Sequence, residues 1–209
     1  MKKTLVLSTV IALSSLSHGA SVTINNITGS GQDLVFADSF GNPLESGFIA
    51  VYSFDSEMIP RSASELLSNG TTGELGLAAF DSSTSNNSPD PGAFTFDFTI
   101  GNDAVRDLFV VIGDGDTLAS SSILGLLNTS LQLDGDDSGS PTGDTLTYNA
   151  TGAGSELLIG SISRGTVDWG NTVGNSYEAN ILSLAAVPEP SSSLLLGIGL
   201  FAASARRRR

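Results

Sequence analysis

The stretch that decides the fold is GAFTFDFTI, residues 92–100. Every second residue in it is apolar, so that Phe94, Phe96, Phe98 and Ile100 alternate with Thr95, Asp97 and Thr99. Successive side chains of a β-strand point to opposite faces of a sheet. The alternation therefore predicts a strand with one face in a hydrophobic core and the other face in water.

Similar short apolar runs lie on both sides of this stretch, separated by clusters of Gly, Asn, Asp, Ser and Pro. They occupy residues 21–27, 33–38, 47–54, 76–80, 106–113, 144–150, 156–162 and 177–187. Many short strands between turn signals are typical of a β-sandwich. We therefore predict an all-β domain, a single antiparallel sandwich of jelly-roll type. Residues 36–54 are predicted to form a hairpin around Gly41-Asn42-Pro43.

One or two short helices are expected beside the strands. Ser62 and Glu65 have the spacing of a capping box just after Pro60, and Asn69-Gly70 supplies a stop. The sequence predicts a helix between them. Residues 117–128, TLASSSILGLLN, fit a short helix and a strand equally well.

The N-terminal 20 residues have the layout of a secretory signal peptide. Lys2 and Lys3 precede an apolar stretch from Leu5 to Leu16, and small residues follow it. Apolar side chains cover the whole circumference of the helix that these residues would form, which does not fit an amphipathic core helix. We predict export, with cleavage after Gly19 or Ala20.

The C-terminal end pairs an apolar run with a cluster of cations. Leu194 to Ala205 carry no charge, and Arg206, Arg207, Arg208 and Arg209 follow. A helix from Ser191 to Ala205 would be about 22 Å long, against about 30 Å for the hydrocarbon core of a bilayer. Snorkelling arginines and local thinning let such a short helix span. The arginines then act as a stop on the cytoplasmic side, which leaves the preceding chain outside.

The order of elements at this end resembles a known tail. Val187, Pro188, Glu189 and Pro190, a serine run, the apolar run and the arginines together resemble the PEP-CTERM sorting tail of exported Gram-negative proteins. The resemblance covers about the last 22 residues, and it implies recognition by an exosortase, processing near Pro188-Glu189-Pro190 and transient anchoring in the inner membrane. It also implies delivery to the cell surface or the exopolysaccharide matrix. Residues 36–54 further resemble the opening of bodies found on verrucomicrobial PEP-CTERM proteins.

The residues between the two ends, 21–187, form the predicted body, and 188–209 form the sorting tail. The body carries three arginines and 21 Asp and Glu residues, a formal charge of −18. Such a surface repels nucleic acid and anionic lipid. The chain has no cysteine, and its one histidine and both lysines lie in the predicted signal peptide. The body therefore lacks the usual general base, zinc ligands and Schiff-base amine, and we expect no enzyme activity.

One acidic loop matches part of a calcium-binding pattern. Asp134, Asp136 and Ser138 occupy positions 1, 3 and 5 of such a loop, with Gly139 at the turn position. Position 12 is a threonine, so the missing ligand would come from Asp144 or from the Asp114-Gly115-Asp116 turn. A solvated hairpin loop is the simpler interpretation, because Asp and Gly are ordinary turn residues. No cofactor is required, and Ca²⁺ is the one that this loop would hold.

Two aromatic residues suggest a further alternative. Trp169 and Tyr177 could form a platform on which a sugar ring stacks, although a lone Trp is more often a packing residue. Three functions thus remain: a non-catalytic structural or interaction protein of the surface, a lectin-like carbohydrate-binding module with or without calcium, and a glycosidase that uses carboxylates alone. The first is our prediction, with exopolysaccharide as a possible partner, and the other two are alternatives.

Overall fold

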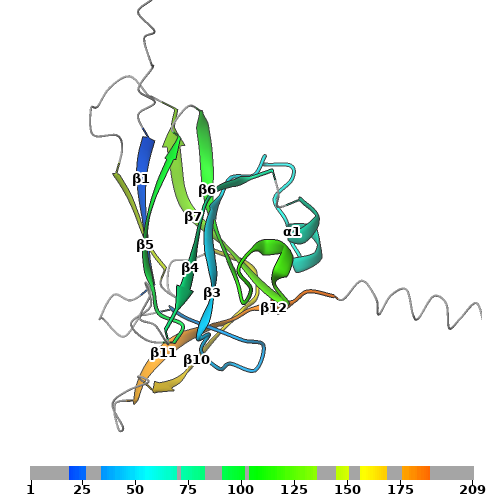
Figure 1. The fold of residues 1–209 in the computed structure, drawn as a ribbon, viewed down its shortest axis with the longest axis vertical. Helices are drawn as coiled ribbons and strands as arrows, with labels where there is room; N and C mark the ends of the chain where they lie inside the picture. The colour runs from blue at the N-terminus through cyan, green and yellow to red at the C-terminus, as the bar shows by residue number, and fades with distance from the viewer. Residues whose placement is uncertain are drawn as a thin grey trace, which may run out of the picture.

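The computed structural model of the chain describes residues 19–26, 34–69, 72–82, 91–101, 104–135, 145–150, 156–168 and 176–188. Within these ranges the chain forms three β-sheets, one α-helix and one short 3₁₀ helix (Figure 1). This confirms the prediction of an all-β fold.

Two of the sheets have three strands each. The first has the order β5 (Thr95–Gly101), β1 (Gly19–Asn25), β8 (Thr145–Asn149), and the second has the order β10 (Ser161–Asp168), β11 (Ser176–Ser183), β2 (Leu34–Ala37). The β1–β8 and β11–β2 pairs are parallel. The prediction of a purely antiparallel sandwich is therefore wrong, because segments far apart in the chain supply a neighbour to each of these strands.

The third sheet is larger and antiparallel. Its order is β12 (Ala185–Ala186), β7 (Ile123–Asp134), β6 (Val105–Gly113), β3 (Ser46–Tyr52), β4 (Glu74–Asp81), and β9 (Glu156–Ile159) also pairs with β7. In Figure 1, β1 and β5 lie on one side of this sheet and helix α1 lies on the other. The six-stranded sheet is thus the middle layer of the molecule.

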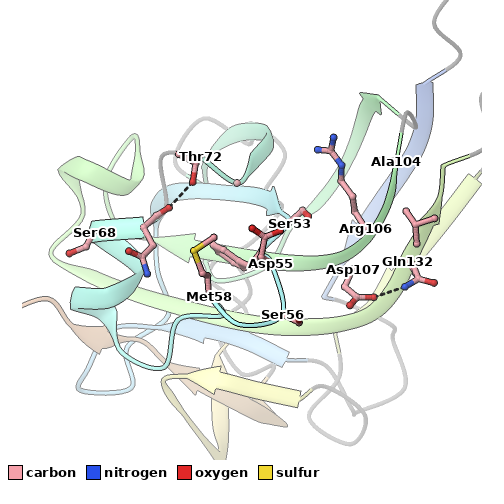
Figure 2. Close-up of a pocket in the computed structure, with 14 residues that line it drawn as sticks. Ser53, Asp55, Ser56, Met58, Ser68, Thr72, Ala104, Arg106, Asp107 and Gln132 are labelled. Atoms are coloured by element: carbon pink, nitrogen blue, oxygen red, sulfur yellow. Dashed lines mark hydrogen bonds between the residues drawn. The ribbon is translucent and has the colours of Figure 1, made fainter.

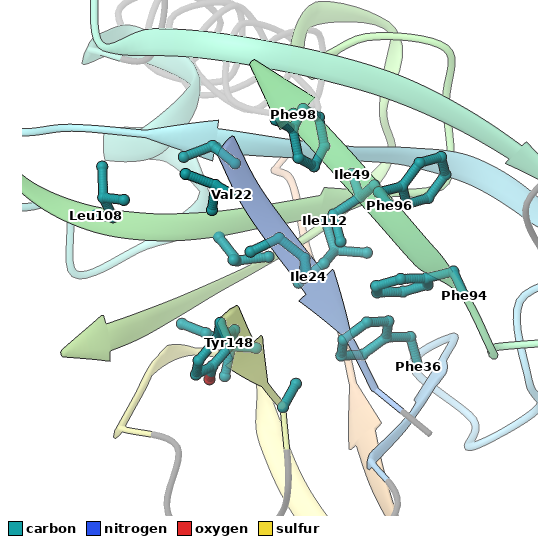
Figure 3. Close-up of a cluster of buried hydrophobic side chains, with 14 of the residues drawn as sticks. Val22, Ile24, Phe36, Ile49, Phe94, Phe96, Phe98, Leu108, Ile112 and Tyr148 are labelled. Atoms are coloured by element: carbon teal, nitrogen blue, oxygen red, sulfur yellow. The ribbon is translucent and has the colours of Figure 1, made fainter. Parts of the chain in front are cut away.

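Strand β5 forms the centre of the main core, as its alternation predicts. Phe96, Phe98 and Ile100 are buried, and the residues between them are exposed. The rings of Phe94, Phe96 and Phe98 follow one another at centroid distances of 5.8 and 6.0 Å, and Phe94 stacks on Phe36 at 4.7 Å (Figure 3). This row of rings fills the space between the three-stranded sheets and the inner face of the six-stranded sheet.

The central strands of the six-stranded sheet are buried on both faces. On β3, Ile49 and Val51 join the main core, whereas Phe48 and Tyr52 join a second cluster on the outer face. Helix α1 (Ala63–Asn69) covers that outer cluster with the buried side chain of Leu66. Two covered faces explain why β3 is an unbroken apolar run in the sequence, since neither set of alternating side chains meets water.

The predicted helix is confirmed, and its cap differs in one detail. The N–H of Glu65 donates to Ser62 Oγ at 3.2 Å, as in a capping box. The carboxylate of Glu65 accepts from the N–H of Arg61 at 2.8 Å, one residue before the usual partner. Residues 117–128, which the sequence left open, contain the 3₁₀ helix Leu118–Ser120 and the first half of β7.

The predicted hairpin over residues 36–54 is wrong, although its turn exists. The N–H of Asp38 donates to the carbonyl of Asn42 at 2.8 Å, and Ala37 makes an isolated bridge with Pro43. Hydrogen bonds from the Asn42 amide and from the N–H groups of residues 40–42 hold the pKa of the Asp38 carboxyl below its usual value. After the turn the chain crosses from the sheet of β2 to the six-stranded sheet, so β2 and β3 pair with other strands.

The prediction of a single strand over residues 156–162 is also wrong. Gly160, with φ +117°, separates β9 from β10, and these two strands belong to different sheets. A backbone in this region of φ favours glycine. Because of this break, the two halves of one apolar run belong to two sheets: β9 pairs with β7 in the six-stranded sheet, and β10 pairs with β11 in a three-stranded sheet.

The described chain begins in strand β1 and ends two residues after strand β12. Gly19 and Ala20 are already part of β1, where Ala20 is buried and pairs with Ile100, so the first strand starts two residues before the predicted signal-peptide boundary. None of the helices in the described ranges is long and apolar enough to cross a membrane. The apolar run Leu194 to Ala205 and the predicted signal sequence up to His18 lie outside those ranges.

Candidate functional site

The last described segment is fixed to the edge of the six-stranded sheet. Ala185 and Ala186 pair with the first residues of β7, and the N–H of Val187 donates to the carbonyl of Ser122 at 2.8 Å. The side chains of Ala185 and Val187 pack against the outer apolar cluster. Pro188, the next residue, is exposed. The described chain therefore reaches the first two residues of the predicted sorting motif, Val187 and Pro188.

The loop that receives Val187 is held in shape by one carboxylate. Asp114 accepts hydrogen bonds from the N–H groups of Ser122 and Ile123 at 2.8 and 3.1 Å, and from the Ser122 hydroxyl. These bonds hold Ser122 in place, and the Ser122 carbonyl accepts from Val187. Of the sorting motif, Glu189 and Pro190 lie outside the described residues, as do Arg206 to Arg209.

Strand register separates Asp114 from the predicted calcium loop. Asp134 pairs with Val105 at one end of the β6–β7 ladder, and Asp114 follows Gly113 at the other end. The nine residues of β6 span about 26 Å at about 3.3 Å per residue. The suggestion that the Asp114 turn completes the calcium site is therefore wrong.

The rest of the calcium prediction stays a prediction. Asp134 is exposed at the end of β7, whereas Asp136, Ser138 and Asp144 lie outside the described residues. Across the ranges that the structure describes, no group of three or more acidic side chains is placed to hold a metal ion.

Of the predicted aromatic platform, the structure describes only the backbone of Tyr177. β10 and β11 form an antiparallel pair in which Val167 is opposite Tyr177, so Tyr177 lies near the tip of this hairpin. Trp169 follows the last residue of β10 and lies outside the described residues, as does the side chain of Tyr177. The stacking role of the two rings remains a prediction.

A groove that the sequence did not indicate lies at the end of the six-stranded sheet remote from Pro188. It has a volume of about 910 Å³ and runs between the loop after β3, the end of α1 and the start of β6 (Figure 2). Hydroxyl, amide and carboxylate side chains dominate its lining. They include Ser53, Asp55, Ser56, Ser68, Asn69, Thr72, Asp107 and Gln132.

One polar pair is placed by strand register. Asp107 on β6 is directly opposite Gln132 on β7, and Gln132 Nε2 donates to Asp107 Oδ1 at 2.8 Å. Both side chains are exposed. In Figure 2 they lie at one side of the groove, with Asp55 and Met58 on the other side. The sequence predicts a strand over residues 106–113, but Gln132 lies outside every predicted strand, so the sequence does not bring these two residues together.

The inner end of the groove borders an aromatic cluster. Phe54 is half-buried, stacks on Tyr52 at 5.6 Å and meets Phe109 edge-on at 5.3 Å. Tyr52 donates its hydroxyl hydrogen to Glu74 at 3.0 Å. Burial raises the pKa of the Tyr52 phenol, and the neighbouring Glu74 carboxylate raises it further, so the phenol is protonated and neutral at physiological pH. The Tyr52 phenol beside the groove therefore carries no charge.

The comparisons with known proteins concern the tail alone. Residues 186–209 match the PEP-CTERM protein-sorting motif. No curated protein and no solved structure matches the chain. The match begins at Ala186, within the last strand of the body, and confirms the resemblance found in the sequence.

Proposed function

We propose, from the PEP-CTERM match, that this chain is an exported protein that an exosortase sorts and processes through its C-terminal tail. The tail anchors the protein transiently in the inner membrane, and the body then reaches the cell surface or the extracellular matrix. There it has a structural or interaction role without catalysis. We propose that residues 21–187 form one sandwich domain, in which two parallel strand pairs occur beside the antiparallel ones.

The single observation that carries this proposal is the match over residues 186–209. The position of the motif supports it, because Val187 makes the last backbone hydrogen bond of the described chain and the exposed Pro188 follows at once. Pro188 and Pro190 bias the residues before them toward extended conformations. An extended segment next to a folded domain suits the cleft of a processing enzyme.

The non-catalytic role rests on composition. Without Cys, Lys or His in the body, nucleophilic and acid–base chemistry would depend on carboxylates, Tyr, Ser and Thr. The carboxylate-only glycosidase and the Trp169–Tyr177 lectin site are not part of the proposal, because no described pair of residues favours either.

The test compares processing in a host with and without its exosortase gene. We expect the surface form from the intact host to lack every peptide after Pro190, and the deletion host to keep the full tail in its membrane fraction. Glu189→Ala in the motif should block processing, whereas Glu57→Ala, an exposed carboxylate of the body, should not. Mass spectrometry of both fractions measures the result. Recovery of Leu194 to Phe201 from the surface pool of the intact host would contradict the proposal.

A further inference from the structure

We propose that the groove at the β6–β7 end of the sheet binds a neutral polysaccharide chain. This inference goes beyond sorting, because it concerns a site on the body and does not depend on how the tail is processed. It assigns the ligand to a surface about 26 Å along the β6–β7 ladder from the sorting motif.

The floor of the groove is a part of the sheet face that no described residue covers. Alternation along β6 places Val105, Asp107 and Phe109 on the outer face. Phe109 is buried in the outer cluster under α1 and Phe54, whereas Asp107 and Val105 are exposed. The covered part of the outer face therefore ends at Phe109. The side chains of Asp107 and Val105, which come before it on β6, are open to a ligand.

The polar groups on the floor suit a ligand rich in hydroxyl groups. Asp107 uses one carboxylate oxygen for Gln132, which leaves its other oxygen and the second amide hydrogen of Gln132 facing outward as an adjacent acceptor and donor. Two neighbouring hydroxyls of a sugar ring match such a pair, because each hydroxyl both donates and accepts. Asp55 and Ser53 on the opposite side add further acceptors.

Apolar surface is exposed beside these polar groups. Met58 and Val105 line the groove and are 55% and 64% exposed, and they are two of the four most exposed large apolar side chains in the described ranges. Binding a chain whose rings present C–H faces would remove this surface from water. A mixture of apolar contacts and a few placed polar groups is the general composition of ligand sites, and about 910 Å³ is within their usual range of about 300–1,000 Å³.

Charge selects a neutral polymer over an anionic one. The body has a formal charge of −18, and Asp55 and Asp107 both line the groove. Anionic chains such as uronic-acid polymers would be repelled. Arg106 also borders the groove, but it points to the other side of its strand from Asp107 (Figure 2). Its charge is therefore directed away from the Asp107–Gln132 pair.

A second carboxylate–amide pair on the same strand provides a matched control. Asn128 on β7 donates to Glu156 on β9 at 2.8 Å, the same distance as in the Asp107–Gln132 pair, and it lies outside the groove. The double variant Asp107→Ala/Gln132→Ala removes the groove pair together, so neither partner is left alone. The double variant Asn128→Ala/Glu156→Ala removes the control pair, together with the hydrogen bond that Asn128 Oδ1 accepts from the N–H of Ser130 at 3.0 Å. The exposed groove pair contributes little to folding, and thermal unfolding of each variant checks that the fold is intact.

The experiment uses the protein purified from the exporting host. If the protein is found in the membrane fraction, it is purified in a mild detergent. The fraction in which it occurs reports on sorting, and binding reports on the groove, so the two proposals fail separately. Affinity electrophoresis in gels that contain laminarin, hydroxyethyl cellulose, dextran or xylan measures binding to neutral chains. Alginate is the anionic comparison, and a casein peptide digest is the peptide comparison.

We expect retardation by at least one neutral polysaccharide and none by alginate. The groove double variant should bind about tenfold more weakly, the size expected for the loss of two hydrogen bonds, and the control variant should bind as the unmodified protein does. The proposal is overturned if no neutral polysaccharide retards the protein, if the two double variants behave alike, or if only alginate or the peptide digest binds.

Discussion

Asn26 is the residue on which three separate segments depend. Its side chain is fully buried, donates to the carbonyls of Leu34 and Gly92 at 2.9 and 2.7 Å, and accepts from the N–H of Phe94 at 2.7 Å. It thereby joins the end of β1, the start of β2 and the approach to β5. Removing the amide would take the side-chain acceptor from the N–H of Phe94 and one donor each from the carbonyls of Leu34 and Gly92. The Gly92 carbonyl would keep the hydrogen bond that it accepts from the N–H of Phe36 at 3.1 Å.

We predict that Asn26→Ala lowers the free energy of unfolding by about 2–4 kcal/mol, since a buried N–H without an acceptor costs about 1–3 kcal/mol and each hydrogen bond lost from the two carbonyls costs about 1 kcal/mol. Urea denaturation followed by tryptophan fluorescence or circular dichroism measures the change. Asn149→Ala, at an exposed position in β8, is the control and should change stability by less than about 0.5 kcal/mol. Equal effects of the two substitutions would refute the role assigned to Asn26.

At the scale of elements, the junction between β9 and β10 shows how one residue divides an apolar run. Gly160 has φ +117°, and a Cβ atom there would lie 2.9 Å from the carbonyl oxygen of Ser183 and 3.1 Å from Leu182 Cδ1. Any other residue would therefore strain both the backbone and the start of the β10–β11 ladder.

We predict that Gly160→Ala destabilises the protein by about 2 kcal/mol, within the range of about 1–3 kcal/mol for a residue held in a disfavoured backbone region. Gly101→Ala is the matched control, because a Cβ atom at the end of β5 meets no atom within 4 Å. Thermal unfolding of both variants checks the prediction. A Gly160→Ala protein as stable as the Gly101→Ala protein would show that the junction tolerates a side chain.

Elements whose signal is local were predictable from the sequence. The alternation from Phe94 to Ile100 and the spacing of Ser62 and Glu65 each specify a strand face or a helix start within a few residues. The pairing of β2 with β11 was not predictable, because parallel register between distant segments leaves no local pattern. Nor was the role of Asn26, since an asparagine between two strands resembles an ordinary turn residue.

The candidate sites also differ in how far the sequence alone could predict them. The sorting motif is contiguous, so its order of residues could be recognised directly, and the match at residues 186–209 confirms it. The groove depends on the β6–β7 register that places Asp107 opposite Gln132, and on where the cover of α1 ends. Unbroken apolar runs such as residues 47–52 indicate a strand covered on both faces, but they do not say how far the cover extends.

At the scale of the whole molecule, the last strand of the body, β12, pairs with the edge of the six-stranded sheet just before the sorting tail begins. β12 and Val187 contribute one edge pairing, one backbone hydrogen bond and the packing of two apolar side chains on the outer cluster. Stability should therefore depend on residues 185–187 and be independent of the sorting tail.

We predict that a chain ending at Pro188 unfolds at the same urea concentration as the full-length chain from the host without its exosortase gene, with both measured in the same mild detergent. A chain ending at Leu184 should lose about 2 kcal/mol, the sum expected for a small apolar area and one hydrogen bond. Both chains carry the same signal peptide, so secretion and purification are matched. If the chain ending at Pro188 is less stable than the full-length chain by a similar amount, the tail takes part in the fold.

The edge position of β12 has a mechanical consequence. A pulling force on the C-terminal end enters the body at Val187 and is met first by a two-residue strand. Hydrogen bonds at a short edge strand break a few at a time, whereas the longer ladder of β6 and β7 shares a load over nine registered pairs. Release of residues 185–187 adds about 10 Å of extended chain at about 3.3 Å per residue. The end of the body therefore acts as a short extensible link that yields under tension before the main core does.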